Sequence, residues 1–271
     1  GNKYFKDEDG SCFRAYRFVD NSKAYDTVDS AEVFGKSGKA FGRFQKYLSD
    51  FPAESLSEII KNFYNTIWRY ENEFIPAVQA DKADRAVNCG EEIKFVMHRR
   101  EDCKKLVELI EKGELPLRVT HNDTKLNNVL FDSDSDDAIC VIDLDTVMPG
   151  LALYDFGDSI RFGANSCAED DDNYDKVELM LDYFEAYAKG FLSEAGDALN
   201  QCEIDNLAFS AKLMTFECGM RFLTDYLNGD TYFKTAYPEH NLVRAKNQFA
   251  LVADMERKME QMQQIIKLSL I

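Results

Sequence analysis

The chain has 271 residues, 45% of them hydrophobic, and a formal net charge of −17 at pH 7. This length and apolar content fit one or two globular domains with a substantial core, and they exclude a disordered chain. The negative charge argues against binding to nucleic acid or to an anionic membrane, because phosphates would be repelled. It does not exclude phosphate ligands that carry Mg²⁺, since the cation would lie between the carboxylates and the phosphates.

Cysteine usage and the lack of a long apolar segment bear on the cellular compartment of the protein. Seven cysteines are scattered along the chain without a C-x-x-C pair. The odd number and the scatter argue against structural zinc and against a disulfide framework, and free thiols are typical of the reducing cytosol. No apolar run is long enough to cross a membrane, and no secretory signal is present. We therefore expect a cytoplasmic protein without membrane contact; the sequence does not indicate its oligomeric state.

In chain order, the first predicted element is a β-hairpin over residues 3–19, with its turn at DEDG. Apolar residues at helical spacing predict a helix over 31–48. Two short strands, 129–131 and 139–142, are predicted on either side of the acidic turn DSDSDDA. Further helices are predicted at 54–80 (one or two helices), 90–113, 173–196, 203–228 and 239–267. The expected fold class is α+β and mainly helical, with a short hairpin in the middle of the chain.

Two stretches imitate ligand-binding loops. GKSGKAFG at 35–42 resembles a phosphate loop, but Ser30 occupies the position of the required first glycine. The glycines of this stretch instead favour close packing of a helix. The acidic run 132–137 resembles a calcium loop, but Asp137 stands where that loop needs glycine. A solvated hairpin turn is the better interpretation.

The stretch VTHNDTKLNNVLFD contains a set of polar residues at fixed offsets. His121, Asp123, Lys125 and Asn128 match the catalytic loop H-x-D-x-x-x-x-N of phosphoryl-transfer enzymes. The Asp can accept the proton of an attacking hydroxyl, and the Asn can turn its amide oxygen toward a metal ion. The Lys can reach the γ-phosphate and offset charge in the transition state. His121 is expected to bond the loop backbone and not to act as a base.

A second acidic cluster, VIDLDTV, follows closely and supplies a carboxylate for the metal. Asp143 is predicted at the end of the strand over 139–142, where it would hold Mg²⁺ against the nucleotide together with Asn128. Asp145 would lie on the same face if the strand continued. The sequence therefore predicts phosphoryl transfer from ATP with Mg²⁺.

The stretch THNDTKLNNVLFD…VIDLDTVMPGLALYDFGDSIRFGAN resembles the aminoglycoside phosphotransferase and choline kinase group, whose members are relatives of protein kinases. Within that group the chain is most similar to N-acetylhexosamine 1-kinases, which phosphorylate the anomeric hydroxyl of N-acetylglucosamine or N-acetylgalactosamine. The supporting stretches FRAYRFVDNSKAYD, AFGRFQKYLSDF, RFLTDYLNGDTYFK and HNLVRAKNQFALV extend the resemblance over nearly the whole chain. It implies a kinase-like C-terminal lobe that binds ATP, Mg²⁺ and a small-molecule sugar.

The resemblance also implies roles for individual residues. Asp123 would be the catalytic base and would contact the substrate, and Lys125 would assist it. Asn128 and Asp143 would bind Mg²⁺. The nucleotide would be contacted by Phe18, Val19, Asn128 and Asp143.

Three residues resemble the sugar-contacting residues of that family, and each has a structural alternative. Arg221 would contact the sugar, or it could pair with Asp225 one helical turn away. Tyr232 and Phe162 would stack on the sugar, or they could be core aromatics. Asp155, in LYDFGD, is expected to brace the catalytic loop as a structural carboxylate.

The small N-terminal lobe of the family is largely missing from the pattern. Residues 1–19 have room for two strands and a turn, and no VAIK-like segment supplies the Lys that grips the α- and β-phosphates. We divide the chain into a remnant hairpin and hinge at 1–19 and a helical catalytic and substrate lobe at 20–271. The intact enzyme should be a kinase, whereas this chain alone should bind ATP weakly and turn over little.

Two alternatives stay open. The acceptor could be another hydroxyl compound, such as choline, which calls for an aromatic cage, homoserine, or an aminoglycoside, which calls for a strongly acidic cleft. The chain could also be a non-catalytic pseudokinase scaffold. Asp123, Asn128 and Asp143 argue against that, because a pseudokinase has no need to keep all three.

Overall fold

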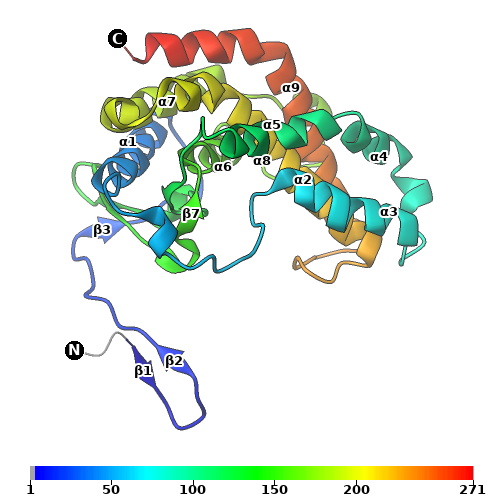
Figure 1. Ribbon diagram of the computed structural model, residues 1–271, viewed down its shortest axis with the longest axis horizontal. Coiled ribbons are helices and arrows are strands. Elements are labelled where there is room, and N and C mark those ends of the chain that lie inside the picture. Colours follow the sequence, from blue (N-terminus) through cyan, green and yellow to red (C-terminus); the bar gives the residue numbers. More distant parts are fainter. Residues whose placement is uncertain (1–3, 271) are drawn as a thin grey trace.

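A computed structural model describes residues 4–270 of the chain. Helices make up most of the body, and a thin β-hairpin projects from it at the N-terminal end (Figure 1). The central helix is α8 (Gln201–Asn228), which packs on α6 (Ala152–Gly163) and α9 (His240–Leu268). It begins at a capping box in which the Asn200 and Glu203 side chains each accept the other's backbone N–H. No helix within residues 4–270 is long and apolar enough to cross a membrane.

The glycine-rich stretch 35–42 lies inside α1 (Ala31–Tyr47), which packs along α7 (Leu181–Ala195). A Cβ at Gly42 would lie 2.3 Å from the carbonyl oxygen of Phe191, so only glycine allows this approach of the two helices. This confirms close helix packing in place of a phosphate loop.

A hairpin is present within the predicted range 3–19, but it is shorter, with strands only between residues 5 and 13, and residue 3 lies outside the described part of the chain. Strands β1 (Phe5–Lys6) and β2 (Cys12–Phe13) pair antiparallel. Asp7 holds the turn by accepting the Ser11 backbone N–H at 2.8 Å, and Gly10 takes a φ of 87° that favours glycine.

The two predicted central strands are also present, as β5 (Val129–Asp132) and β6 (Ala138–Val141). A third strand that the sequence did not reveal, β3 (Ser22–Lys23), pairs with β5, so the sheet order is β3-β5-β6. In the acidic turn, Asp132 Oδ1 accepts the backbone N–H groups of Asp134 and Ser135, as in an ordinary solvated turn.

A separate two-stranded sheet holds together the two ends of the segment that carries the polar clusters. Strand β4 (Arg118–Thr120) pairs antiparallel with β7 (Met148–Gly150). The polypeptide between them, which carries both polar clusters, is thereby closed into a loop over the body.

Three predicted helices have different bounds. Helix does not begin at residue 54, because Asn62 has a positive φ of 56° and Asn65 caps the next helix through the Trp68 N–H. The predicted helix 90–113 is divided into two at His98 and Arg99. Of the predicted helix 173–196, only the part from Leu181 onward is α-helix; before it lie the short turn Tyr174–Lys176 and a β-bridge between Asn165 and Leu179. The observed elements are α2 (Thr66–Arg69), η2 (Tyr70–Phe74), α3 (Ile75–Ala80), α4 (Gly90–Met97) and α5 (Arg100–Glu111), with short helical turns η1 (Ala53–Ser55), η3 (Ala86–Asn88), η4 (Leu126–Asn128), η5 (Leu144–Thr146), η6 (Tyr174–Lys176) and η7 (Gly196–Ala198).

Candidate active site

The loop between β4 and η4 is anchored by one buried carboxylate on α6. Asp155 accepts the backbone N–H groups of His121 at 2.9 Å and Asn122 at 2.8 Å, and the Gln45 amide at 2.8 Å. Burial raises the pKa of Asp155 to about 6, against the opposing effects of His121, the two amides and Gln45. Asp155 therefore has the bracing role expected from the sequence.

His121 is fully buried and its ring contacts backbone and apolar groups. Its Nε2 lies 2.8 Å from the carbonyl oxygen of Ile142, and its edge meets the rings of Phe41 and Phe44. The Thr146 hydroxyl donates to the His121 carbonyl at 2.7 Å. These contacts tie the loop to the segment after β6 and leave His121 in a structural position.

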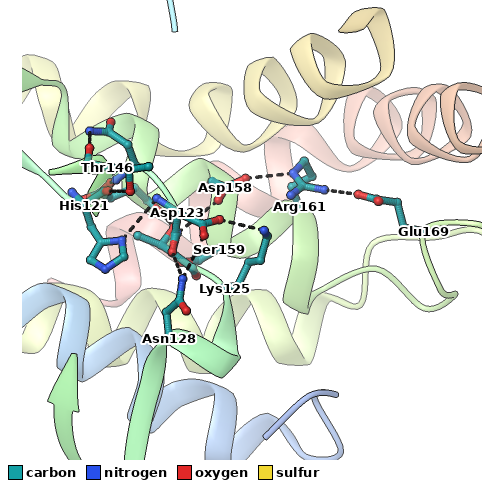
Figure 2. Close-up of polar contacts among 12 residues, drawn as sticks. His121, Asp123, Lys125, Asn128, Thr146, Asp158, Ser159, Arg161 and Glu169 are labelled. Carbon is teal, nitrogen blue, oxygen red and sulfur yellow. Dashed lines mark hydrogen bonds and ion pairs between the residues drawn. The ribbon is translucent and has the colours of Figure 1, made fainter. Parts of the chain in front are cut away.

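Asp123 lies at the centre of a short polar chain (Figure 2). Lys125 Nζ is 2.9 Å from Oδ1 of Asp123, and Asn128 Nδ2 donates to Oδ2 at 3.0 Å and to the Asp123 carbonyl at 2.8 Å. Burial would lower the pKa of Lys125, but the Asp123 carboxylate outweighs burial and the pKa is raised. Because Asn128 uses its nitrogen on Asp123, its amide oxygen is available for another ligand.

The backbone just before Asp143 is hydrogen-bonded to that of Asn128. The Ile142 N–H donates to the Asn128 carbonyl at 2.9 Å, and Asp143 follows with a left-handed φ of 60°. Strand β6 ends at Val141, so Asp143 and Asp145 are not on one strand face, contrary to the expectation for a continuing strand. Asp145 forms an ion pair with Arg14, whereas the exposed Asp143 carboxylate has no ion pair or hydrogen bond within residues 4–270.

The donor set fits a hard cation such as Mg²⁺, which takes carboxylate and amide oxygens and keeps water or phosphate as its remaining ligands. Within the described part of the chain, no cluster of three or more His, Cys, Asp or Glu side chains could hold a metal by itself. A cation bound by Asn128 and Asp143 would therefore depend on other ligands, such as the phosphates of a nucleotide.

A cavity of about 500 Å³ extends from the catalytic loop toward α8. It is lined by Asp123 and Lys125 of the loop and by Arg221 on α8 and Tyr232 and Phe233 after it, among others. Five basic and four acidic side chains line this cavity, although the chain as a whole is strongly acidic. The lining is therefore not strongly negative.

The acidic side chains of the cavity are mostly neutralised by neighbours. Arg161 lies 3.0 Å from Asp158 and 2.6 Å from Glu169 (Figure 2). Glu217 is buried, 3.4 Å from Arg69, and accepts the Thr66 hydroxyl at 2.6 Å. Burial raises the pKa of Glu217, against the opposing effects of Arg69 and Arg221. Few free negative charges remain to attract a cation.

Arg221 projects from α8 into a group of aromatic rings. Its guanidinium carbon is 5.5 Å from the ring centres of Phe63 and Phe233 and 5.9 Å from that of Tyr232. Its guanidinium forms no ion pair within residues 4–270. The alternative partner, Asp225, instead accepts the backbone N–H groups of residues 231–233. We call Arg221, Phe63, Tyr232 and Phe233 the aromatic wall.

The structure brings several predicted residues together and leaves others apart. Asp123 and Lys125 share the cavity with Arg221 and Tyr232. Phe162, on α6, is half-buried against the core and is not among the described residues that line the cavity, so its sugar contact stays a prediction. Phe18 is 79% exposed and Val19 lies in the segment before β3, away from this cavity lining. Their nucleotide contact also stays a prediction.

Among the lining residues that sequence reasoning missed are Phe63, Asp158, Arg161 and Glu217. Asp158 and Arg161 lie one turn apart on α6 in FGDSIRFG, a spacing that could have predicted their pairing. No sequence signal distinguishes Phe63, because it lies in an irregular segment. Glu217 lies one turn before Arg221 on α8, where a carboxylate would ordinarily be taken for a surface residue.

Comparisons with known proteins indicate the family and the fold of the chain. A family model described as a phosphotransferase enzyme family matches residues 4–190. Three solved structures share the fold at TM-scores of 0.56 to 0.58. An ethanolamine kinase of Plasmodium vivax is 16% identical, with 91% of this chain and 67% of that chain covered, at a TM-score of 0.57. A choline kinase from Cryptosporidium parvum Iowa II is 14% identical, with 98% and 75% covered, at 0.58. A microcompartment-associated aminopropanol kinase is 15% identical, with 96% and 76% covered, at 0.56.

Proposed function

The chain belongs to the phosphotransferase enzyme family, and we propose that it transfers the γ-phosphoryl group of ATP to the anomeric hydroxyl of an N-acetylhexosamine. The products would be the sugar 1-phosphate and ADP. The family gives the class of chemistry, phosphoryl transfer to a small molecule, and the mainly helical kinase-like fold agrees with it.

In this mechanism Asp123 orients the sugar O1 hydroxyl and accepts its proton. The oxygen attacks the γ-phosphorus in line, a P–O bond forms, and the bond to the bridging β–γ oxygen breaks to release ADP. Asn128 holds the Asp123 carboxylate at 3.0 Å, and the Lys125 ammonium stabilises negative charge beside it. Asn128 and Asp143 would hold Mg²⁺, which when bound offsets the charge of the β- and γ-phosphates.

The observation that carries the sugar proposal is the aromatic wall with Arg221 inside it. A choline or ethanolammonium cation would seek such a group of rings, but here a guanidinium of the chain already occupies it and would repel the ligand. A sugar has neutral hydroxyls and an acetamido carbonyl that can accept hydrogen bonds from Arg221, and an apolar ring face that can stack on Tyr232. The balanced charge of the cavity likewise disfavours a polycationic aminoglycoside.

An amino alcohol is the second candidate acceptor, because the three similar structures are named as kinases of ethanolamine, choline and aminopropanol. Their TM-scores of 0.56 to 0.58 support a common fold, but identities of 14% to 16% are too low to carry their acceptors over to this chain. The two candidates are therefore distinguished by comparing turnover of acceptors that differ in charge.

We would measure ADP release by the full-length protein with N-acetylglucosamine, N-acetylgalactosamine, glucose, choline, ethanolamine, homoserine and kanamycin, each with and without Mg²⁺. The expected result is Mg²⁺-dependent turnover with an N-acetylhexosamine, with the phosphate located at C1 by phosphorus NMR. Faster turnover of choline or ethanolamine would establish the second candidate. Metal-dependent ATP binding without turnover of any acceptor would support the alternative that the chain is a non-catalytic pseudokinase scaffold.

For the N-terminal segment we propose that residues 1–19 belong to the nucleotide side of the site and residues 20–271 to the catalytic and substrate lobe. The aromatic rings of Phe5, Phe13, Tyr16 and Phe18 are between 54% and 79% exposed on or after the projecting hairpin. Such exposure fits a segment that packs against further protein or against a nucleotide. Calorimetry should find weaker ATP binding for residues 1–271 alone than for the full-length protein.

A further inference from the structure

A second cavity, of about 530 Å³, lies on the other side of the aromatic wall. It is bounded by α2, η2 and α3 on one side and by α8 on the other, and Figure 1 shows α2 and α3 beside α8. Ile60, Arg221, Tyr232 and Phe233 line both cavities, so the two spaces meet at these residues. We call this second space the outer chamber.

The proposed orientation of the acceptor directs its O4 end toward the outer chamber. Asp123, Arg221 and Tyr232 line the same cavity, and Arg221 and Tyr232 also line the outer chamber. We therefore place O1 at Asp123 and the opposite end of the sugar ring, which carries O4, toward Arg221 and Tyr232. A substituent on O4 would then pass Arg221 and enter the outer chamber. A volume of about 500 Å³ lies within the ordinary range for a small-ligand pocket, so the first cavity alone can hold one hexosamine.

The outer chamber has the composition of a sugar-binding surface. It is lined by Trp68, the one tryptophan of the chain, which is half-buried on α2. Two amides, Asn72 and Asn228, also line it. Asn72 uses its Nδ2 on the Trp68 carbonyl at 2.9 Å, which leaves its amide oxygen as an acceptor. An indole face with nearby amides can stack on a sugar ring and bond its hydroxyls.

The free charges of the outer chamber are positive. Lys61 and Lys82 line it and form no ion pair within the described residues. Its two carboxylates are engaged: Glu73 lies 2.7 Å from Arg69, and Asp225 accepts the backbone N–H groups of residues 231–233. Together with Arg221, this arrangement disfavours a ligand with an ammonium group.

We propose that the outer chamber is a second sugar subsite, which receives a neutral sugar ring linked to O4 of the acceptor hexosamine. The inference rests on the proposed sugar kinase function and extends it from a monosaccharide to a disaccharide acceptor phosphorylated at its reducing end. Trp68 stacks on the second ring, and the cations around the chamber select against an amine on that ring.

Three acceptors test this in the full-length protein. They are N-acetylglucosamine, N,N′-diacetylchitobiose, and the chitobiose analogue that has a free amine on the non-reducing ring. The expected KM for N,N′-diacetylchitobiose is about tenfold below that for N-acetylglucosamine, because the second ring adds about 1.4 kcal/mol of binding. The amine analogue should lose most of this gain.

Variants assign the effect to the chamber. Trp68→Ala should reduce the ratio of the two KM values to near one, whereas Trp68→Phe should retain part of it, since a ring still stacks. Tyr47→Ala serves as a matched control, because Tyr47 is 75% exposed at the end of α1 and lines neither cavity. It should leave both KM values unchanged.

The two proposals fail in different ways. Turnover of N-acetylglucosamine with no gain for N,N′-diacetylchitobiose, or an equal effect of Trp68→Ala on both sugars, overturns the second subsite and leaves the sugar kinase standing. Equal KM values for the neutral disaccharide and its amine analogue overturn the charge selection. Absence of turnover with every N-acetylhexosamine acceptor overturns the proposed function and the subsite together.

Discussion

Around Asp123 the polar groups are held by partners in the chain, whereas the Arg221 guanidinium, which lines the same cavity, has no ion pair within residues 4–270. Lys125 and Asn128 contact both oxygens of the Asp123 carboxylate, and the loop backbone is bonded to Asp155. Within residues 4–270, the Arg221 guanidinium lies over the rings of Phe63, Tyr232 and Phe233. A group that transfers a proton must be positioned before the substrate arrives, but a group that selects the substrate needs unused hydrogen-bonding capacity.

The largest expected effect is at Asp123. Asp123→Asn keeps the size of the side chain but removes the proton acceptor, so kcat should fall by about a thousandfold. Sugar affinity, measured by calorimetry in the full-length protein, should stay nearly unchanged. A parallel loss of affinity would mean that Asp123 acts mainly in ground-state binding, and the contrast with Arg221 would disappear.

Asp155→Asn tests whether the catalytic loop depends on its anchor. An amide cannot accept all three hydrogen bonds with equal strength, so the free energy of unfolding at pH 7 should fall by about 3 kcal/mol. Urea unfolding measures it, and Asp197→Asn, at an exposed position, is the control. An unchanged free energy of unfolding would show that the anchor contributes nothing to stability.

The same residue gives a pH dependence of stability. The pKa of Asp155 is raised by burial from 3.8 to about 6, so the folded chain binds this proton more tightly than the unfolded chain. Its contribution to the free energy of unfolding is therefore largest at low pH and decreases as the pH rises from about 4 to about 6. Urea unfolding at pH 5 and pH 7 should show the wild-type chain losing stability relative to Asp155→Asn over this interval. A constant difference would contradict the raised pKa.

A smaller effect is expected at the aromatic wall. Arg221→Gln removes a charged donor to the sugar, so KM for N-acetylglucosamine should rise about tenfold while kcat changes little. Arg257→Gln makes the same charge change at a side chain that is 67% exposed on α9, and it should leave KM unchanged. A fall in kcat alone for Arg221→Gln would place Arg221 with the catalytic group.

The smallest effect concerns a hydrogen bond between the loop and Tyr64, whose ring lies 4.5 Å from that of Phe63 in the aromatic wall. Tyr64 Oη donates to the carbonyl of Asn122 at 3.0 Å, and Tyr64 lines the cavity beside the aromatic wall. Tyr64→Phe removes only this hydrogen bond, so the free energy of unfolding should fall by about 1 kcal/mol. Tyr16→Phe, at a side chain that is 71% exposed, is the control in urea unfolding.

Sequence periodicity located some helices closely and missed the bounds of others. Helix α1 and the long helices α8 and α9 agree with prediction to within a few residues. The segment 54–65 has helical spacing as well, but Asn62 adopts a positive φ and Asn65 serves as a cap. Periodicity records which residues are apolar, and it does not record these backbone choices.

By itself, the sequence predicted the catalytic loop, because His121, Asp123, Lys125 and Asn128 lie within eight residues at the spacing that the proposed chemistry requires. Tertiary structure decided what faces that loop. Asp225 could have paired with Arg221 on the same helix, but the backbone of residues 231–233 takes its carboxylate. Arg221 therefore packs among the rings of the aromatic wall, because the Asp225 carboxylate already accepts these backbone N–H groups.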